Sequence, residues 1–289
     1  MDDKKIICFI ILHYNTIEET RRCISTIMML EHFNNSKIVI VDNASPNQTG
    51  RLLAEEYKFD EIVDVILREQ NDGFSSGNNI GCAYAIKKWN PDFLVVVNND
   101  IEFPQKDFLT RMLEEYEKTH FSILGPDIYS PVRNVHQSPM DEYPPSRNRV
   151  MITIVLNQLM LWIYPLSYPL MKKYFNYMDM NIQAKEYKKS QENVCLMGAC
   201  MIYSREYIDA RNKIFEPETK FYYEEYIQTI WCLRNHKKII YKPDITVYHM
   251  EGKATRSINR NEKSRIKFRM QNILQAAKVY RKYLSTNCI

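Results

Sequence analysis

Hydrophobic runs of strand length alternate with segments of helical periodicity over the first 125 residues of the chain. Thr16 and Glu19 form the pattern of a capping box before the first helical segment. The alternation predicts an α/β fold with a mostly parallel, Rossmann-like central sheet, and the almost continuously apolar strands predict helices on both of its faces. The predicted strands are Ile6–Leu12, Lys37–Val41, Ile62–Leu67, Phe93–Val97 and Phe121–Leu124. The predicted helices between them are Glu18–Leu30, Thr49–Tyr57, Asn78–Lys88 and Lys106–Lys118.

Polar clusters follow each of the first four predicted strands. They are His13–Asn15, Asp42–Ser45, Asn71–Phe74 and Asn98–Asp100. In a doubly wound sheet, ligands bind outside the carboxyl ends of the strands. The sequence therefore predicts a binding site at this edge of the sheet, to which several strands contribute.

The pattern loosens after residue 125, where a proline-containing stretch leads into Val150–Met171, 22 residues without a charged side chain. This length is close to that of a membrane span, but Pro165 and Pro169 interrupt the segment. A span would also place the N-terminal clusters and the C-terminal motifs on opposite sides of a bilayer. We therefore expect a helical insertion over 126–192 that lies either on a membrane surface or on the protein's own core, and the sequence leaves both open.

Short elements return in the last third of the chain. The terminal segment is basic, which is typical of a solvated helix face and also of a lipid-binding one. The predicted elements are Val194–Tyr203, a helix over Glu224–Asn235, strands at Ile239–Tyr241 and Thr246–Tyr248, and a terminal helix near Asn261–Leu284.

Composition narrows the class of protein. The 289 residues carry 39 Lys and Arg against 35 Asp and Glu, so a net charge of +4 gives no support for nucleic acid as the main partner. The seven cysteines are an odd number without a C-x-x-C pair, which argues against a disulfide framework or a zinc knuckle. The charged N-terminus runs directly into a strand rather than a signal peptide. We therefore expect a reducing, cytoplasmic location.

Two strand-end clusters carry carboxylates with a possible binding role. Asp100 follows a buried strand beside Asn98 and Asn99, where an oxygen-preferring divalent cation could bind. Asp42 also ends a strand, where a carboxylate can accept from a nucleobase or a ribose hydroxyl. The structural alternative at both positions is an ordinary Asp or Asn turn.

The segment Asn71–Gly81 contains three of the seven glycines of the chain within nine residues. We interpret it as a loop that leads into a helix N-terminus, whose free N–H groups favour anions. The segment matches neither a Walker A loop nor the G-x-G-x-x-G fingerprint, so ATP and NAD lose their main support as ligands.

The C-terminal third adds carboxylates, a histidine and cations. Glu224 and Glu225 open a helix, where one of them could act as a general base or both could simply favour the helix dipole. His249 ends a strand and is either a metal ligand or structural. Lys253, Thr255 and Arg256 follow it in a segment that could hold phosphate.

The order and spacing of these motifs resemble the family-2 inverting glycosyltransferases, a GT-A-fold group that includes rhamnosyltransferase-like enzymes of bacterial surface polysaccharide assembly. The resemblance covers most of the chain except about 126–192. The matching segments are Ile10–Asn15, Val41–Ser45, Asn71–Gly81, Asn98–Asp100, Gly198–Met201, Tyr223–Glu225 and Pro243–Thr255.

The resemblance implies a GT-A-type fold with a helical insertion and a C-terminal helix. It divides the chain into a donor-binding half at 1–125, the insertion at 126–192, an acceptor and catalytic half at 193–260, and a basic helix at 261–289. It also implies Glu225 as the general base, in the place of an Asp in the family's Glu-Asp pair, although the change leaves open whether Glu224 or Glu225 faces the acceptor. Gly198 and Tyr223 would contact the acceptor.

The resemblance further implies a divalent cation, Mg²⁺ or Mn²⁺, held by Asp100 and His249. Asn98 stands where the family's DXD-type motif has its first Asp. Asp42 would bind the nucleobase of a nucleoside-diphosphate sugar, and the Tyr14–Asn15 turn would lie near the nucleotide. The full set of expected donor-binding residues is Tyr14, Asn15, Asp42, Asn43, Asn71, Gly73, Phe74, Asn78, Asn98, Asn99, Lys253, Thr255 and Arg256.

The expected function is inverting transfer of a sugar from a UDP- or dTDP-sugar to a hydroxyl of a glycan or lipid-linked acceptor in surface polysaccharide synthesis. The alternative is a catalytically impaired nucleotide-sugar-binding protein or a membrane-associated scaffold, for which Asn98 and Val150–Met171 are the respective signals. The expected location is the cytoplasm, with peripheral contact at the inner face of the cell membrane as a further hypothesis. Neither the sugar, the acceptor nor the oligomeric state follows from the sequence.

Overall fold

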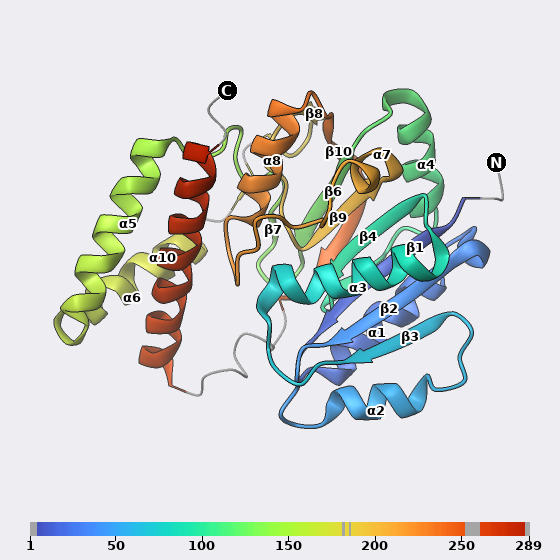
Figure 1. Cartoon of the computed structure of the whole chain (residues 1–289), viewed down its shortest axis with the longest axis horizontal. Coiled ribbons are helices and arrows are strands. Elements are labelled where there is room, and N and C mark those ends of the chain that lie inside the picture. The colour runs from blue at the N-terminus through green and yellow to red at the C-terminus, as the bar shows by residue number, and fades with distance from the viewer. Residues whose placement is uncertain (1–4, 181–182, 185, 252–260, 287–289) are drawn as a thin grey trace.

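A ten-stranded mixed sheet forms the centre of the molecule in a computed structural model, which describes residues 5–180, 183–184, 186–251 and 261–286 (Figure 1). The strand order is β3-β2-β1-β4-β9-β6-β10-β5, with β7 paired to β6 and β8 paired to β10. The strands are β1 (Ile7–His13), β2 (Ser36–Asp42), β3 (Val63–Leu67), β4 (Phe93–Asn98), β5 (Ile101–Glu102), β6 (Ile123–Ser130), β7 (Val135–His136), β8 (Gln191–Glu192), β9 (Cys200–Ser204) and β10 (Ile239–His249).

The main strands run in one direction, with one long exception. β1, β2, β3 and β4 pair in parallel, as do β6 and β10. Between these two groups lies β9, which is antiparallel to both β4 and β6. The predicted α/β fold with a mostly parallel sheet is therefore confirmed.

Helices cover both faces of this sheet because alternate strand residues point to opposite sides. Ile7, Phe9 and Ile11 of β1 belong to a buried cluster with α1, α2 and α4, whereas Cys8 and Ile10 belong to a cluster with α3, α7 and α8. The helices on the first face are α1 (Ile17–Met28), α2 (Thr49–Glu56) and α4 (Phe108–Thr119), with a short 3₁₀ turn at Phe33–Asn35. Those on the second face are α3 (Gly73–Trp89), α7 (Arg205–Asp209) and α8 (Glu224–Arg234).

The C-terminal strand prediction is corrected by the structure. Ile239–Tyr241 and Thr246–Tyr248 belong to one strand, β10, whose pairing with β6 shifts register between Lys242 and Thr246. Pro243 lies inside this irregularity, where its missing N–H costs no ladder hydrogen bond. The break in the apolar pattern therefore marks a bulge rather than the end of a strand.

The insertion forms a separate helical layer with the C-terminal helix (Figure 1). The uncharged segment Val150–Met171 is divided between α5 (Arg147–Trp162) and α6 (Tyr164–Met180), which meet at Ile163. Both helices pack against α10 (Glu262–Thr286). Across the described part of the chain, no helix combines the length and the apolar character needed to cross a membrane.

Candidate active site

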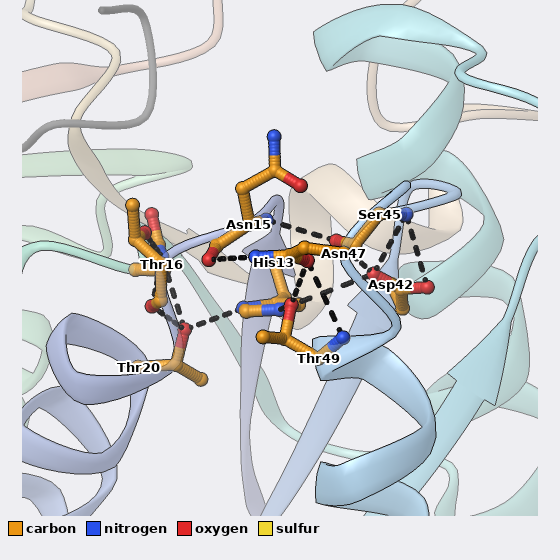
Figure 2. A network of polar contacts seen from close by, with 9 residues as sticks. His13, Asn15, Thr16, Thr20, Asp42, Ser45, Asn47 and Thr49 are labelled. Atoms are coloured by element: carbon orange, nitrogen blue, oxygen red, sulfur yellow. Dashed lines mark hydrogen bonds and ion pairs between the residues drawn. The ribbon is translucent and has the colours of Figure 1, made fainter. Parts of the chain in front are cut away.

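A buried histidine at the end of β1 contacts two helices, α1 and α2, at the predicted edge of the sheet (Figure 2). His13 Nδ1 lies 2.7 Å from Thr20 Oγ1 of α1, and His13 Nε2 lies 2.9 Å from Thr49 Oγ1 of α2. Burial lowers the pKa of His13 to about 4, so the ring is neutral at physiological pH. His13 therefore fixes the strand end, and its full burial leaves it no contact with a ligand.

The turn after β1 is held against the turn after β2. Ser45 donates from Oγ to Asp42 Oδ1 at 2.5 Å and accepts from the Asn15 backbone N–H at 2.9 Å. Asn47 Nδ2 donates to the Asn15 carbonyl at 2.8 Å, and Asn15 adopts a left-handed φ of 65° (Figure 2). The Tyr14–Asn15 turn and the Asp42 carboxylate, both expected to bind the nucleotide, therefore lie together.

Asp42 occupies space that a neighbouring glycine leaves free. A Cβ atom at Gly50 would lie 2.1 Å from Asp42 Cγ. Burial raises the pKa of Asp42, although hydrogen bonds from Ser45 lower it in part. Asp42 thus has a fixed orientation before any ligand binds, and Gly50 is a residue that the sequence analysis missed.

Asn43 connects β2 to the segment that begins α3. Its Nδ2 group donates to the Gly73 carbonyl at 3.1 Å and to Asn71 Oδ1 at 3.3 Å, while its Oδ1 accepts from the Asp72 N–H at 2.9 Å. Gly73 has φ of 84° and lies against Lys220, where a Cβ atom would meet backbone at 2.6 Å. The predicted donor residues Asn43, Asn71 and Gly73 are therefore in mutual contact.

The predicted glycine-rich loop is wrong for most of its length. α3 begins at Gly73 rather than at Asn78, so Gly77 and Gly81 lie inside the helix. A Cβ atom at Gly77 would lie 2.5 Å from Leu12, and one at Gly81 would lie 2.6 Å from Ile10. These two glycines permit close packing of helix on sheet, and only Gly73 lies at the helix N-terminus.

Two further predicted donor residues lie on α3. Phe74 packs edge-on against Phe215, and its N–H donates to the Lys220 carbonyl at 2.7 Å. Asn78 is fully buried and donates from Nδ2 to the Phe74 carbonyl at 3.0 Å. Phe74 therefore links α3 to the segment that precedes Glu224, whereas Asn78 has no exposed surface.

Asn98 and Asn99, at the end of β4, make different contacts. Asn98 is half-buried, and its N–H donates to the Ala199 carbonyl at 2.9 Å. Asn99 is buried and donates from Nδ2 to Thr16 Oγ1 at 2.7 Å and to Thr20 Oγ1 at 3.0 Å. The capping-box pattern predicted that the Thr16 side chain caps α1, and this prediction is wrong. Thr16 Oγ1 accepts the hydrogen bond from Asn99 instead.

Asp100 and His249 lie together, as the resemblance implied, with 3.3 Å between Asp100 Oδ1 and His249 Nε2. Gln137, which the sequence analysis missed, accepts from His249 Nδ1 at 2.7 Å and donates from Nε2 to Glu251 Oε1 at 2.6 Å. Glu251 also forms an ion pair with Arg133, and its carboxylate accepts the hydrogen bond from the Gln137 amide nitrogen. The Gln137 amide is thereby oriented with its oxygen towards His249, whose proton then lies on Nδ1.

This arrangement fits a divalent cation. With Nδ1 protonated, the lone pair of His249 Nε2 faces the Asp100 carboxylate, and only a cation between them, a proton or a metal ion, makes the contact favourable. Adjacent ligands of one octahedral cation lie about 3 Å apart, which is close to the 3.3 Å between Asp100 Oδ1 and His249 Nε2. Within the ranges that the structure describes, no group of three His, Cys, Asp or Glu side chains could hold a metal. A cation at Asp100 and His249 would therefore need ligands from the substrate or from water.

The two adjacent glutamates have different surroundings. Glu224 is buried, and its Oε2 accepts from Thr219 Oγ1 at 2.9 Å. Glu225 is half-buried and lies against Gly198, where a Cβ atom would be 2.5 Å from Glu225 Oε1. Burial raises the pKa of both carboxyls, and the charge of Glu225 raises the pKa of Glu224 further. Both groups therefore hold a proton more strongly than an exposed glutamate.

Gly198 lies between Glu225 and the end of β4. It precedes Ala199, whose carbonyl accepts from Asn98, so Gly198 lies beside the end of β4. On the other side, Thr219 Oγ1 lies 3.2 Å from Ser75 Oγ of α3 and donates to Glu224. A continuous series of contacts thus connects the glutamate pair to the ends of β2 and β4.

Tyr223, the second predicted acceptor residue, packs against the C-terminal helix α10. It lies at the N-terminus of α8 with φ of 70°, and its ring is 5.3 Å from that of Tyr280 and 5.5 Å from that of Tyr226. The predicted phosphate-binding residues Lys253, Thr255 and Arg256 lie outside the described residues. Glu224, Glu225, Gly198, Asp100, His249 and the donor turns are the predicted residues that the structure gathers.

Comparisons with known proteins give the family and the fold of the chain. The family model "Glycosyl transferase family 2" matches residues 8–211. A hexosyltransferase of low-salt glycan biosynthesis, Agl10 of Haloferax volcanii, is 28% identical over 144 residues, which are 50% of this chain. The match spans only 41% of that relative's length.

Solved structures share the fold at low sequence identity. S. aureus TarS residues 1–349 superpose with a TM-score of 0.54 at 16% identity, covering 97% of this chain and 72% of that one. The mannosyltransferase PcManGT of Pyrobaculum calidifontis, in complex with GDP-Man and Mn²⁺, has a TM-score of 0.54 at 11% identity, covering 100% of this chain and 78% of that one. The expected GT-A fold is confirmed.

Proposed function

Because the chain belongs to glycosyl transferase family 2, we propose that it is an inverting glycosyltransferase that uses a nucleoside-diphosphate sugar. The observation that carries the proposal is the position of Glu225. Its carboxylate lies against Gly198, which is next to the end of β4 at Asn98. Asp100 follows that strand end and lies 3.3 Å from His249 of β10. A base and a site for a charged leaving group are thus neighbours.

Glu225 acts as the general base in this proposal. The acceptor hydroxyl oxygen forms a bond to the anomeric carbon while the bond from that carbon to the diphosphate oxygen breaks, and Glu225 takes the hydroxyl proton. The nucleoside diphosphate leaves from the opposite face, so the configuration at the carbon inverts. Glu224 is assigned a supporting role because its carboxylate is buried and engaged by Thr219.

Asp42, Asn43 and the Tyr14–Asn15 turn bind the nucleoside in this proposal. Ser45 and Gly50 hold Asp42 in place before a ligand arrives, which reduces the entropy lost on binding. A UDP- or dTDP-sugar is the proposed donor, and UDP-GlcNAc and GDP-Man in complexes of S. aureus TarS and PcManGT support the general class. The name of the Haloferax relative supports a hexose as the transferred sugar.

Asp100 and His249 are the proposed ligands of Mg²⁺ or Mn²⁺. When bound, the cation offsets the charge that develops on the leaving diphosphate. Gln137 and Glu251 orient His249 for this task. Mn²⁺ in the PcManGT complex supports a metal ion as part of the site.

The proposed acceptor is a hydroxyl of a glycan or of a lipid-linked sugar in surface polysaccharide synthesis, and a rhamnosyltransferase-like activity remains within the proposal. The proposed location is the cytoplasm at the inner face of the cell membrane. The six cysteines that the structure describes are free and buried, which supports a reducing compartment.

A nucleotide-sugar-binding protein without catalysis is the second candidate. Asn98 favours it, because an amide in place of a carboxylate weakens cation binding. This candidate predicts that a nucleoside-diphosphate sugar stabilises the protein against heat but is never consumed.

Consumption of UDP- and dTDP-sugars in the presence of Mn²⁺ separates the two candidates. We expect wild type to release nucleoside diphosphate and Glu225→Gln to be slower by a factor of about 100 to 10,000. Glu117→Gln, a change on the exposed face of α4, is the matched control and should keep the wild-type rate. Equal rates in wild type and Glu225→Gln would contradict the assigned base.

A further inference from the structure

An apolar surface covers the outer side of the α5 and α6 helices. Six side chains of Ile, Val, Leu, Met and Trp on these helices have exposed fractions between 53% and 83%. Those on α5 are Ile152, Val155 and Trp162, and those on α6 are Leu166, Leu170 and Met180. We call these six residues the hairpin face. Exposed large apolar side chains gathered on two neighbouring helices mark a contact with another molecule or a membrane.

The hairpin face is not required for the protein's own core. Val150 and Ile154 of α5 are buried against Ala277 and Tyr280 of α10. Met171 and Phe175 of α6 are likewise buried against Ile266 and Met270 of α10. Because the inner sides of both helices already have these partners, the hairpin face remains available for a second contact.

The charges around the hairpin face are positive. Between Arg147 and Met180, the charged residues are Arg147, Arg149, Lys172, Lys173 and Asp179. Asp179, the single acid among them, pairs with Arg269 at 2.9 Å, and Lys172 pairs with Glu262 at 2.6 Å. Arg147, Arg149 and Lys173 are exposed. Arg281 of α10 borders an open hollow that Trp162 and Met151 also line.

We infer that the hairpin face docks on an anionic lipid bilayer, with both helices lying on the surface rather than crossing it. Apolar side chains with Lys and Arg around them match the chemistry of an acyl layer below anionic headgroups. Trp162 also belongs to a residue type that prefers the membrane interface. A second copy of the chain fits less well, because a symmetric contact would bring the positive borders of two hairpin faces together.

Docking at this face would place the active site near lipid-linked acceptors, a consequence that rests on the proposed function. Tyr223 immediately precedes the glutamate pair and packs against Tyr280 of α10. A side-chain hydrogen bond between Thr153 of α5 and the Tyr223 hydroxyl, which lowers the pKa of Tyr223, connects it to the hairpin as well. The helix α5, which carries half of the hairpin face, therefore contacts the start of α8.

Vesicle flotation of the full chain tests the inference. We expect wild type to float with phosphatidylcholine vesicles that contain about 30% phosphatidylglycerol, and to float less with phosphatidylcholine alone or at high salt. The double variant Trp162→Glu/Leu166→Glu should lose about tenfold or more of the bound fraction. Leu52→Glu/Phe59→Glu, which changes two exposed apolar residues near α2, is the matched control and should float like wild type.

Three outcomes would overturn the inference. They are wild type that fails to float, hairpin variants that float like wild type, and hairpin variants that instead dissociate a wild-type dimer in light scattering. Circular dichroism checks that each variant is folded. Donor consumption with a water-soluble acceptor is measured in parallel: lost flotation with retained turnover leaves the proposed function intact, and retained flotation without turnover leaves the docking surface intact.

Discussion

Glu224 and Glu225 are adjacent in sequence but differ in what surrounds their carboxylates. Thr219 donates to Glu224 inside the protein, whereas Glu225 is half-buried beside Gly198. Adjacent helical residues point about 100° apart, which explains why one carboxylate can be enclosed while the other reaches a substrate. The sequence alone could not decide between them, because the enclosing partner Thr219 precedes the helix in a segment without a motif.

The raised pKa of Glu225 predicts the pH dependence of turnover. A base must be ionised, so kcat/KM should fall as the pH drops through the raised pKa of the glutamate pair, close to neutrality. The pH profile of wild type measures this, with Glu117→Gln as the control. An acid limb near the ordinary glutamate pKa of about 4.3 would contradict the assignment.

Glu224 should lower stability at neutral and higher pH. Its folded-state pKa lies above the unfolded value, so the folded protein binds the proton more tightly than the unfolded chain does. The free energy of unfolding therefore decreases as the pH rises from the unfolded pKa to the folded pKa of Glu224. Glu224→Gln keeps an acceptor for Thr219 and removes the buried charge. We expect its Tm to exceed that of wild type by about 2–4 °C at about pH 8, with a smaller difference at about pH 5. An equal or lower Tm at the higher pH would contradict the proposed burial of charge.

Gln137 should control the affinity of the proposed metal site at Asp100 and His249 without being a ligand itself. In Gln137→Leu, the acceptor for His249 Nδ1 is lost, so the ring is no longer held with Nε2 towards Asp100. Loss of such an orienting partner typically weakens metal binding by about 10- to 100-fold. Mn²⁺ titration followed by electron paramagnetic resonance, without any donor, measures the affinity. Gln271→Leu on the exposed side of α10 should bind Mn²⁺ like wild type, and equal affinity in Gln137→Leu would contradict the positioning role.

At the scale of elements, the glycines of α3 have a structural role that differs from the predicted one. Three glycines in nine residues predicted a loop that leads into an anion-favouring helix N-terminus, yet Gly77 and Gly81 lie within the helix and face β1 and β2. Glycine is typical both of a loop and of a helix that packs closely on a sheet, so the residue type alone does not distinguish them. Only the position of the sheet below the helix distinguishes them, and that position depends on long-range contacts.

Gly81→Ala should therefore destabilise the protein despite its helical setting. The new methyl group would lie 2.6 Å from Ile10 Cγ2 and 2.9 Å from Val41 Cγ2, and β-branched side chains cannot rotate away easily. Overpacking of this kind costs about 1–3 kcal/mol, and the gain from replacing helical glycine by alanine is about 1 kcal/mol. Because the two contacts are this short, we expect the upper half of that range and a net loss of about 1–2 kcal/mol. Urea unfolding measures the loss, with Lys87→Ala at an exposed position of the same helix as the control. An increase in stability would contradict the packing role.

In the insertion, the hydrophobic pattern predicted a helical layer but not which surface that layer contacts. The uncharged segment Val150–Met171 predicted a helical layer on the core or on a membrane. In the structure its inner residues, such as Ile154, contact α10, while its outer residues, such as Trp162, are exposed. A contact with the core therefore exists, and the outer face is available for the proposed membrane contact.

At the scale of the whole molecule, local patterns predicted the N-terminal parallel strands because each strand and its helix are close in sequence. The middle of the sheet could not be predicted in this way. β9 lies antiparallel between β4 and β6, although it follows them by many residues, and this placement brings Gly198 and Ala199 to the end of β4. Gln137 likewise reaches His249 from a distant segment, so no local signal could reveal it.

The anomeric configuration of the product tests the central claim most directly. Nuclear magnetic resonance can follow transfer from an α-linked nucleoside-diphosphate sugar to an acceptor, with wild type and Glu225→Gln compared side by side. We predict that wild type forms the β-linked product from the start and that Glu225→Gln forms it slower by a factor of about 100 to 10,000. A product that retains the α configuration, or an equal rate from the Glu225→Gln variant, would contradict inverting transfer with Glu225 as the base.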